Sequence, residues 1–190
     1  MKINKQIVMW AFLVAFVIVG GVVFSNFKIN SKQPIKTEPV IKNSIDAENM
    51  TFNIDGEMVT LKDGVYRAPT VPDYASSREA RLLEGNSLND DISGDKINDR
   101  VVILVDQPGG TGVFYYIVPI LGKKDGVPVP GKAVFLGDRI IPQSISFSHT
   151  KNLMSVSILE RKETEPFSVT PTVSKRFSFK VVNGELVTVK

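Results

Sequence analysis

A run of acidic residues near the middle of the chain has the spacing of a cation-binding loop. In NDDISGDKINDRVVIL, the side chains of Asp91, Ser93 and Asp95 alternate, and Asp99 follows four residues later. Carboxylate, hydroxyl and carbonyl oxygens are the ligands of Ca²⁺, which takes about 6 to 8 of them without strict geometry. Together with the carbonyl of Ile97, these residues form a candidate calcium site.

The same loop departs from the usual pattern of calcium loops. Lys96 stands where such loops favour glycine, Ser93 replaces a stronger Asp or Asn ligand, and no glutamate follows at the twelfth position. The alternative interpretation is an acidic, solvated turn that bends at Gly94. Both interpretations stay open at the level of the sequence.

Few other residues suggest chemistry. The glycine-rich segment DQPGGTG, 106–112, brings backbone amides near a ligand or simply turns between two hydrophobic strands. The chain has one histidine, His149, no cysteine and no G-x-S-x-G motif. We therefore assign no catalytic residue and no cofactor-binding residue, and the sequence favours a protein that is not an enzyme.

The most hydrophobic part of the chain lies near its N-terminus. The stretch Ile7–Phe24 contains no charge, and as a helix it would be about 27 Å long, close to the hydrocarbon layer of a bilayer. Lys2 and Lys5 precede it, and it is longer than the apolar core of most cleaved signal peptides. We expect a retained signal anchor that crosses the membrane once, with cleavage after Ser25 as the alternative.

Four regions follow from this pattern. Residues 1–6 form a cytoplasmic basic region, 7–24 the transmembrane segment, 25–49 a polar linker, and 50–190 an extracytoplasmic domain. The linker is rich in Asn, Ser, Lys and Pro and is too polar to build a core. The predicted location is the cell membrane, with the C-terminal domain outside the cytoplasm.

The net charge of +3 does not indicate a nucleic-acid partner. The first 49 residues carry six lysines and three acidic residues, whereas the remainder carries 17 basic and 17 acidic residues. Binding to a polyanion needs a clustered basic surface. The lysines are better explained as flanks of the membrane segment, so we predict the membrane as a partner and no nucleic acid.

Strand signals dominate the rest of the sequence. Asp55-Gly56, Asp63-Gly64 and Asn183-Gly184 separate apolar segments in the manner of β-hairpin turns. Residues 113–121 are apolar almost without interruption, so neither face of a strand formed by them would suit solvent. This predicts a central strand that is buried on both sides. Residues 76–85, SSREARLLEG, combine a serine cap, helix formers and a closing glycine, which predicts one short helix. The expected fold is mainly β, an antiparallel sheet or sandwich-like domain with one short helix, preceded by the transmembrane helix.

The order of several short motifs resembles that of a family of small exported, largely uncharacterised bacterial proteins related to LppP/LprE-type lipoproteins. The motifs are SGDKINDRVVIL, DQPGGTGVFYYIVPIL, AVFLGDRI and SKRFSFKVVNGELV. Members of that family typically read GDLNGDGKxDxA, GGSGxFYY and LGDR in this order. The resemblance covers roughly residues 51–190 and implies an exported protein, but it implies no reaction.

The sequence therefore predicts a membrane-anchored extracytoplasmic module that binds or scaffolds an envelope protein or a small molecule that the sequence does not identify. The alternative is a hydrolase of envelope material that uses carboxylates or a metal in the region of the acidic loop. Catalysis predicts carboxylates that converge in a pocket, whereas the structural interpretation predicts carboxylates spread over a turn.

Overall fold

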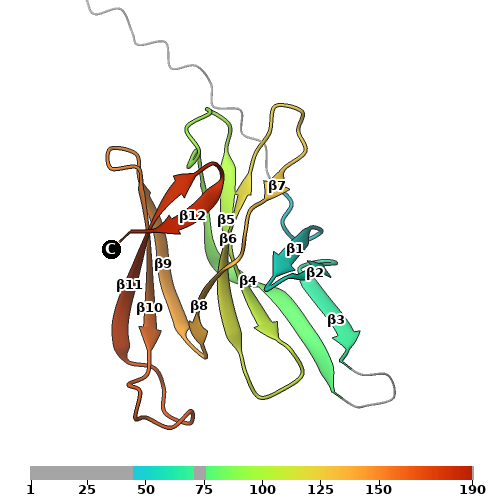
Figure 1. Ribbon diagram of the computed structural model, residues 1–190, viewed down its shortest axis with the longest axis vertical. Coiled ribbons are helices and arrows are strands. Elements are labelled where there is room, and N and C mark those ends of the chain that lie inside the picture. The colour runs from blue at the N-terminus through green and yellow to red at the C-terminus, as the bar shows by residue number, and fades with distance from the viewer. Residues whose placement is uncertain (1–44, 71–75, 190) are drawn as a thin grey trace, which may run out of the picture. The chain divides into compact units, whose positions relative to one another are not determined.

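The computed structural model describes residues 45–70 and 76–189, all of which lie within one unit, Val40–Lys190. The described part contains twelve strands (Figure 1). In chain order they are β1 (Thr51–Ile54), β2 (Glu57–Thr60), β3 (Val65–Pro69), β4 (Ser77–Asp90), β5 (Asp99–Gln107), β6 (Phe114–Leu121), β7 (Val129–Pro130), β8 (Val134–Asp138), β9 (Ile141–Ser148), β10 (Leu153–Glu160), β11 (Val173–Val182) and β12 (Glu185–Thr188).

The strands form three antiparallel sheets. The central sheet has the order β3-β4-β5-β6-β7, and β8 also pairs with β6 beside β7. The second sheet has the order β12-β11-β10-β9, and the third is the hairpin of β1 and β2. Every strand pairing in the described part is antiparallel, which confirms the predicted mainly β fold.

Strand β6 is buried on both sides, as its uninterrupted apolar sequence predicted. Because alternate side chains of a strand point to opposite faces, Tyr116, Val118 and Ile120 enter one core while Ile117 enters another. The first core lies between the central sheet and the β1–β2 hairpin, and it contains Phe52, Ile54, Val59 and Leu61. The second core lies between the central sheet and the four-stranded sheet, and it contains Met154, Val156, Ile158 and Phe179. The central sheet is thus the middle layer.

The three predicted hairpin turns are present. Asp55-Gly56, Asp63-Gly64 and Asn183-Gly184 each place two successive residues at positive φ, between 49° and 93°. This is the conformation of a type I′ turn, whose twist matches that of the strands it joins. The asparagine and aspartate positions tolerate it because their short polar side chains reduce the steric cost of the left-handed region.

The predicted helix at residues 76–85 is wrong, because residues 77–85 belong to strand β4. Residues 77–81 of β4 pair with β3 on one side, and residues 79–82 and 87–90 pair with β5 on the other. Helix propensities of ordinary residues differ from one another by only a few tenths of a kcal/mol per residue. Pairing with a neighbouring strand on each side of β4 outweighs such a preference. Gly85, read as a helix end, has φ of +75° and lies where the β4–β5 register shifts between Leu82 and Ser87. It marks a bulge of the strand.

The predicted transmembrane segment, Ile7–Phe24, and most of the predicted linker lie outside the described residues. Ile45 and Ala47, near the start of the described part, are 6% and 0% exposed and belong to the first core. Among the described residues, no helix has the length and apolar character needed to cross a bilayer.

Candidate functional site

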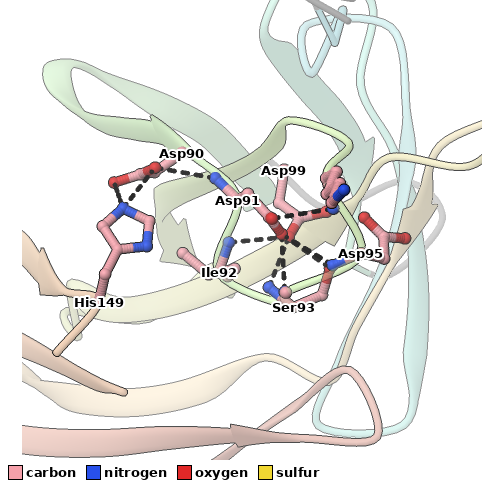
Figure 2. A network of polar contacts seen from close by, with 9 residues as sticks. Asp90, Asp91, Ile92, Ser93, Asp95, Asp99 and His149 are labelled. Atoms are coloured by element: carbon pink, nitrogen blue, oxygen red, sulfur yellow. Dashed lines mark hydrogen bonds and ion pairs between the residues drawn. The ribbon is translucent and has the colours of Figure 1, made fainter. Parts of the chain in front are cut away.

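The acidic loop connects two neighbouring strands of the central sheet. Asp90 ends β4, Asp99 begins β5, and the two residues are directly opposite each other in the antiparallel register. The eight residues between them therefore form a closed loop at the end of this strand pair (Figure 2). The loop's conformation is fixed by its own polar side chains rather than by strand pairing.

Asp91 is the main acceptor of this loop. Its Oδ1 accepts hydrogen bonds from the amides of Gly94 and Asp95, at 2.7 and 3.1 Å, and from the hydroxyl of Ser93 at 3.4 Å. Its Oδ2 accepts from the amide of Lys96 at 2.9 Å. Lys96 has φ of +69°, the left-handed conformation for which calcium loops favour glycine at this position. The carboxylate thus gathers the amides of the turn around itself.

Asp99 fixes the loop from its other end. Only 1% of the residue is exposed, and its Oδ2 accepts from the amides of Ile92 and Ser93 at 3.1 and 2.9 Å. Its Oδ1 accepts from the amide of Gly122, which follows β6, at 2.9 Å. Burial raises the pKa of Asp99 above its ordinary value, and the negative charge of Asp95 acts in the same direction, while the amide hydrogen bonds oppose the shift.

The predicted metal ligands lie in one loop, where the carboxylates of Asp91, Asp95 and Asp99 accept hydrogen bonds from backbone amides. The Oδ1 of Asp95 accepts from the amide of Ile97 at 2.9 Å, and Ile97 is buried. In the part of the chain that the structure describes, no group of three or more His, Cys, Asp or Glu side chains is arranged to hold a metal ion. The predicted ligands, Asp91, Ser93, Asp95, Ile97 and Asp99, would have to direct several oxygens at a common centre to bind Ca²⁺. Solution measurements can test whether the loop binds Ca²⁺.

The single histidine joins this loop to the second sheet. Nε2 of His149, in the turn between β9 and β10, lies 3.0 and 3.1 Å from the two carboxylate oxygens of Asp90 (Figure 2). Its ring also makes an edge contact with Phe147, at 4.9 Å between centroids. The sequence placed His149 in a turn but gave no sign of its partner, because the two residues are 59 positions apart.

A second polar cluster lies beside the first core, and sequence reasoning missed it. Arg78 on β4 pairs with Asp106 on β5 and with Glu57 on β2, and the hydroxyl of Tyr116 donates to Asp55 at 2.6 Å. Burial and the neighbouring carboxylate of Asp55 raise the pKa of the Tyr116 hydroxyl well above its ordinary value. The cluster ties the β1–β2 hairpin to the central sheet.

The alternation of side chains between the two faces of β5 could have revealed Asp106 as a member of this polar cluster. Val102, Leu104 and Asp106 share one face of the strand, so Asp106 extends a row of core positions. A carboxylate in such a row needs a buried partner. The expected helix at residues 76–85 hid that partner, because it removed Arg78 from the neighbouring strand.

The glycine-rich segment 106–112 contains the last two residues of β5 and most of the connection to β6. Gly109 has φ of +95°, and a Cβ there would lie 2.6 Å from the methyl group of Thr70. The segment makes a tight turn between two paired strands, which agrees with the interpretation of these residues as a simple turn.

The chain matches no protein-family model, no curated protein and no solved structure. The resemblance to small exported bacterial proteins therefore stays a prediction from the motifs.

Proposed function

We propose that the protein is a membrane-anchored module whose β domain is held outside the cytoplasm, where it binds or scaffolds another component of the cell envelope. The uncharged stretch Ile7–Phe24 supports the anchor, because its length as a helix suits a bilayer. The polar residues that follow it support a spacer between the membrane and the domain.

The hydrogen bonds within the acidic loop favour a binding or structural role of the domain over the hydrolase alternative. Asp91 and Asp99 accept hydrogen bonds from six backbone amides. A catalytic acid, base or metal ligand must present oxygen atoms to a substrate or an ion. The oxygens of Asp91 and Asp99 instead accept hydrogen bonds from the protein's own backbone. This supports a structural role, in which the two carboxylates hold β4, β5 and the end of β6 together.

Stability distinguishes a structural carboxylate from a catalytic one. If Asp91 has this structural role, Asp91→Ala leaves three exposed turn amides without their acceptor and lowers the free energy of unfolding by about 0.5 to 1.5 kcal/mol. Glu163→Ala, which removes an exposed acid from another loop, is the matched control and changes it little. Removal of a carboxylate kept for catalysis is commonly neutral or stabilising, so an unchanged or raised stability of Asp91→Ala would favour the hydrolase alternative.

The location is tested with single cysteines, since the chain has none of its own. Thr111, in the exposed turn after β5, and Asn4, in the predicted cytoplasmic region, are each replaced by cysteine in the full chain. A membrane-impermeant maleimide should label Thr111→Cys in intact cells and Asn4→Cys only after lysis, with both variants in the membrane fraction. Recovery in the soluble fraction, or the opposite labelling pattern, would overturn the proposed location.

A further inference from the structure

The connection between β6 and β8 presents apolar and basic side chains to solvent. It has the sequence GKKDGVPVPGK, residues 122–132, and we call it the β7 loop. Val127 and Val129 are 64% and 49% exposed, Lys124 and Lys132 are exposed as well, and Lys123 is partly exposed. Three lysines and one aspartate give the β7 loop a net charge of +2. Valines flanked by lysines are suited to the boundary between lipid headgroups and acyl chains.

The β7 loop is held in one conformation although it is exposed. The amide of Gly131 donates to the carbonyl of Pro119 at 2.7 Å, and the amide of Gly126 donates to the carbonyl of Lys123 at 2.9 Å. The two prolines of the loop restrict its backbone further. A preformed loop loses little conformational entropy when it contacts a surface, so a small contact area can be sufficient.

The point at which the chain enters the domain lies beside this loop. A cavity of about 570 Å³ is lined on one side by Ile45, Asp46 and Asn49 and on the other by Lys123 and Val127. In Figure 1 the segment that leads into β1 and the β7 loop lie near each other. The side of the domain that receives the chain from the predicted anchor is therefore the side that carries the exposed valines and lysines.

The number of residues before this point limits how far the domain can lie from the predicted anchor. Twenty residues, 25–44, separate the apolar stretch from Ile45. A linker of this number of residues has an average end-to-end distance of roughly 25 Å in the random-coil limit. Such a tether gives an effective concentration on the order of millimolar, so a weak interaction with the membrane surface is sufficient to keep the loop there.

Two acidic side chains at or near the β7 loop, Asp125 and Asp46, accept hydrogen bonds from the protein. Oδ1 of Asp125 accepts from the amide of Val127 at 3.0 Å, and Asp46 accepts from the amide of Glu48 and the side chain of Asn49 at 3.0 Å each. The net charge of the loop nevertheless stays positive, because its lysines outnumber its one aspartate. Each lysine close to an anionic surface contributes about 1 kcal/mol of attraction.

We propose that the β7 loop is the surface by which the domain rests on the anionic lipid bilayer that holds its own N-terminal segment. The exposed valines enter the headgroup region and the lysines contact lipid phosphates. This inference depends on the proposed membrane anchor. It adds a defined orientation of the domain, with the β7 loop towards the lipid and the β5–β6 turn away from it.

The test uses the full chain reconstituted in vesicles of phosphatidylcholine with phosphatidylglycerol. A nitroxide label is attached to Val127→Cys and, as the control, to Thr111→Cys, which is exposed in the turn at the other end of β6. β6 has 8 residues, so the two ends of the strand are about 23 Å apart. Accessibility to oxygen, which concentrates in lipid, is compared with accessibility to a water-soluble nickel complex.

The expected result is a higher ratio of oxygen to nickel accessibility at Val127 than at Thr111, and a ratio that falls when Lys123 and Lys124 are both replaced by glutamate. Equal ratios at the two sites in protein that floats with the vesicles would overturn the orientation and leave the anchor intact. Low accessibility to both reagents at Val127 would mean that protein rather than lipid covers the loop, and would also overturn the proposal. Protein that does not float with the vesicles would overturn the anchor itself and the orientation with it.

Discussion

Arg78 and Asp106 form a two-pronged ion pair between neighbouring strands of the central sheet. Nε of Arg78 lies 2.8 Å from Oδ1 of Asp106, and Nη2 lies 3.0 Å from Oδ2. The two side chains are only 12% and 4% exposed. Arg78 also contacts Glu57 of β2, so a single guanidinium joins three strands from two sheets. Its planar fork is suited to this geometry in a way that a lysine is not.

Removal of Arg78 should destabilise the fold strongly. Arg78→Ala leaves Asp106 buried without its partner, and an uncompensated buried charge typically costs about 3 to 5 kcal/mol. Arg67→Ala is the matched control, because Arg67 pairs with Glu79 across β3 and β4 while its side chain is 67% exposed. Exposed pairs contribute about 1 kcal/mol or less. Urea unfolding of the full chain in mild detergent measures both, and similar losses in the two variants would show that the pair is not effectively buried.

Close packing between the β7 loop and the C-terminal hairpin gives a second prediction. A Cβ on Gly131 would lie 2.8 Å from the carbonyl oxygen of Gly184 and 2.9 Å from the ring of Pro119. Gly131→Ala should therefore cost about 1 to 3 kcal/mol through overpacking. Gly110→Ala is the control, since a Cβ there meets nothing within 4 Å, and neither Gly131 nor Gly110 has a positive φ. Thermal unfolding compares the two variants, and equal melting temperatures would contradict the tight approach.

The turns and the central strand could be predicted because their signals are local. Asp55-Gly56 and Asn183-Gly184 require positive φ at both positions, and the uninterrupted apolar character of residues 113–121 requires cover on both faces. These constraints act on neighbouring residues and do not depend on the rest of the fold. A sequence pattern can therefore predict them.

Strand β4 and the polar contacts could not be predicted because they depend on distant partners. Residues 76–85 have a helical pattern by themselves, and only their pairing with β3 and β5 makes them a strand. In the candidate site, the spacing of Asp91 and Asp99 drew attention to the loop that connects β4 and β5. The amide of Gly122, 23 positions from Asp99, could not be anticipated from spacing.

Calcium should leave the stability of the protein unchanged. The oxygens of Asp91 already accept hydrogen bonds from the loop, and those of Asp99 are buried against three amides. An ion that bound the native state would raise its melting temperature by mass action. Thermal unfolding of the full chain is compared in excess Ca²⁺ and in chelator, with Asp95→Ala and Glu163→Ala as variants. A calcium-dependent rise that Asp95→Ala abolishes and Glu163→Ala preserves would establish the metal site after all.

The buried carboxyl of Asp99 should make stability depend on pH in a particular direction. Its pKa in the folded protein is raised above the ordinary value of 3.8, because burial disfavours the charged form more than the amides of Ser93 and Gly122 favour it. Between the unfolded and the folded pKa, the folded protein binds more protons at this group. Its contribution to the free energy of unfolding therefore falls as pH rises through that interval, and the full cost of ionisation is present above the folded pKa.

Asp99→Asn isolates this contribution, because asparagine does not titrate and the other acidic residues are common to both proteins. As the pH is lowered from neutral to below 3.8, the wild type should gain stability relative to Asp99→Asn, by about 1.4 kcal/mol for each unit that separates the folded and unfolded pKa values. Urea unfolding of both proteins across this range measures the difference. A relative loss for the wild type on acidification would mean that the amide hydrogen bonds of the acidic loop outweigh burial. Asp99 would then stabilise the fold through its charged form.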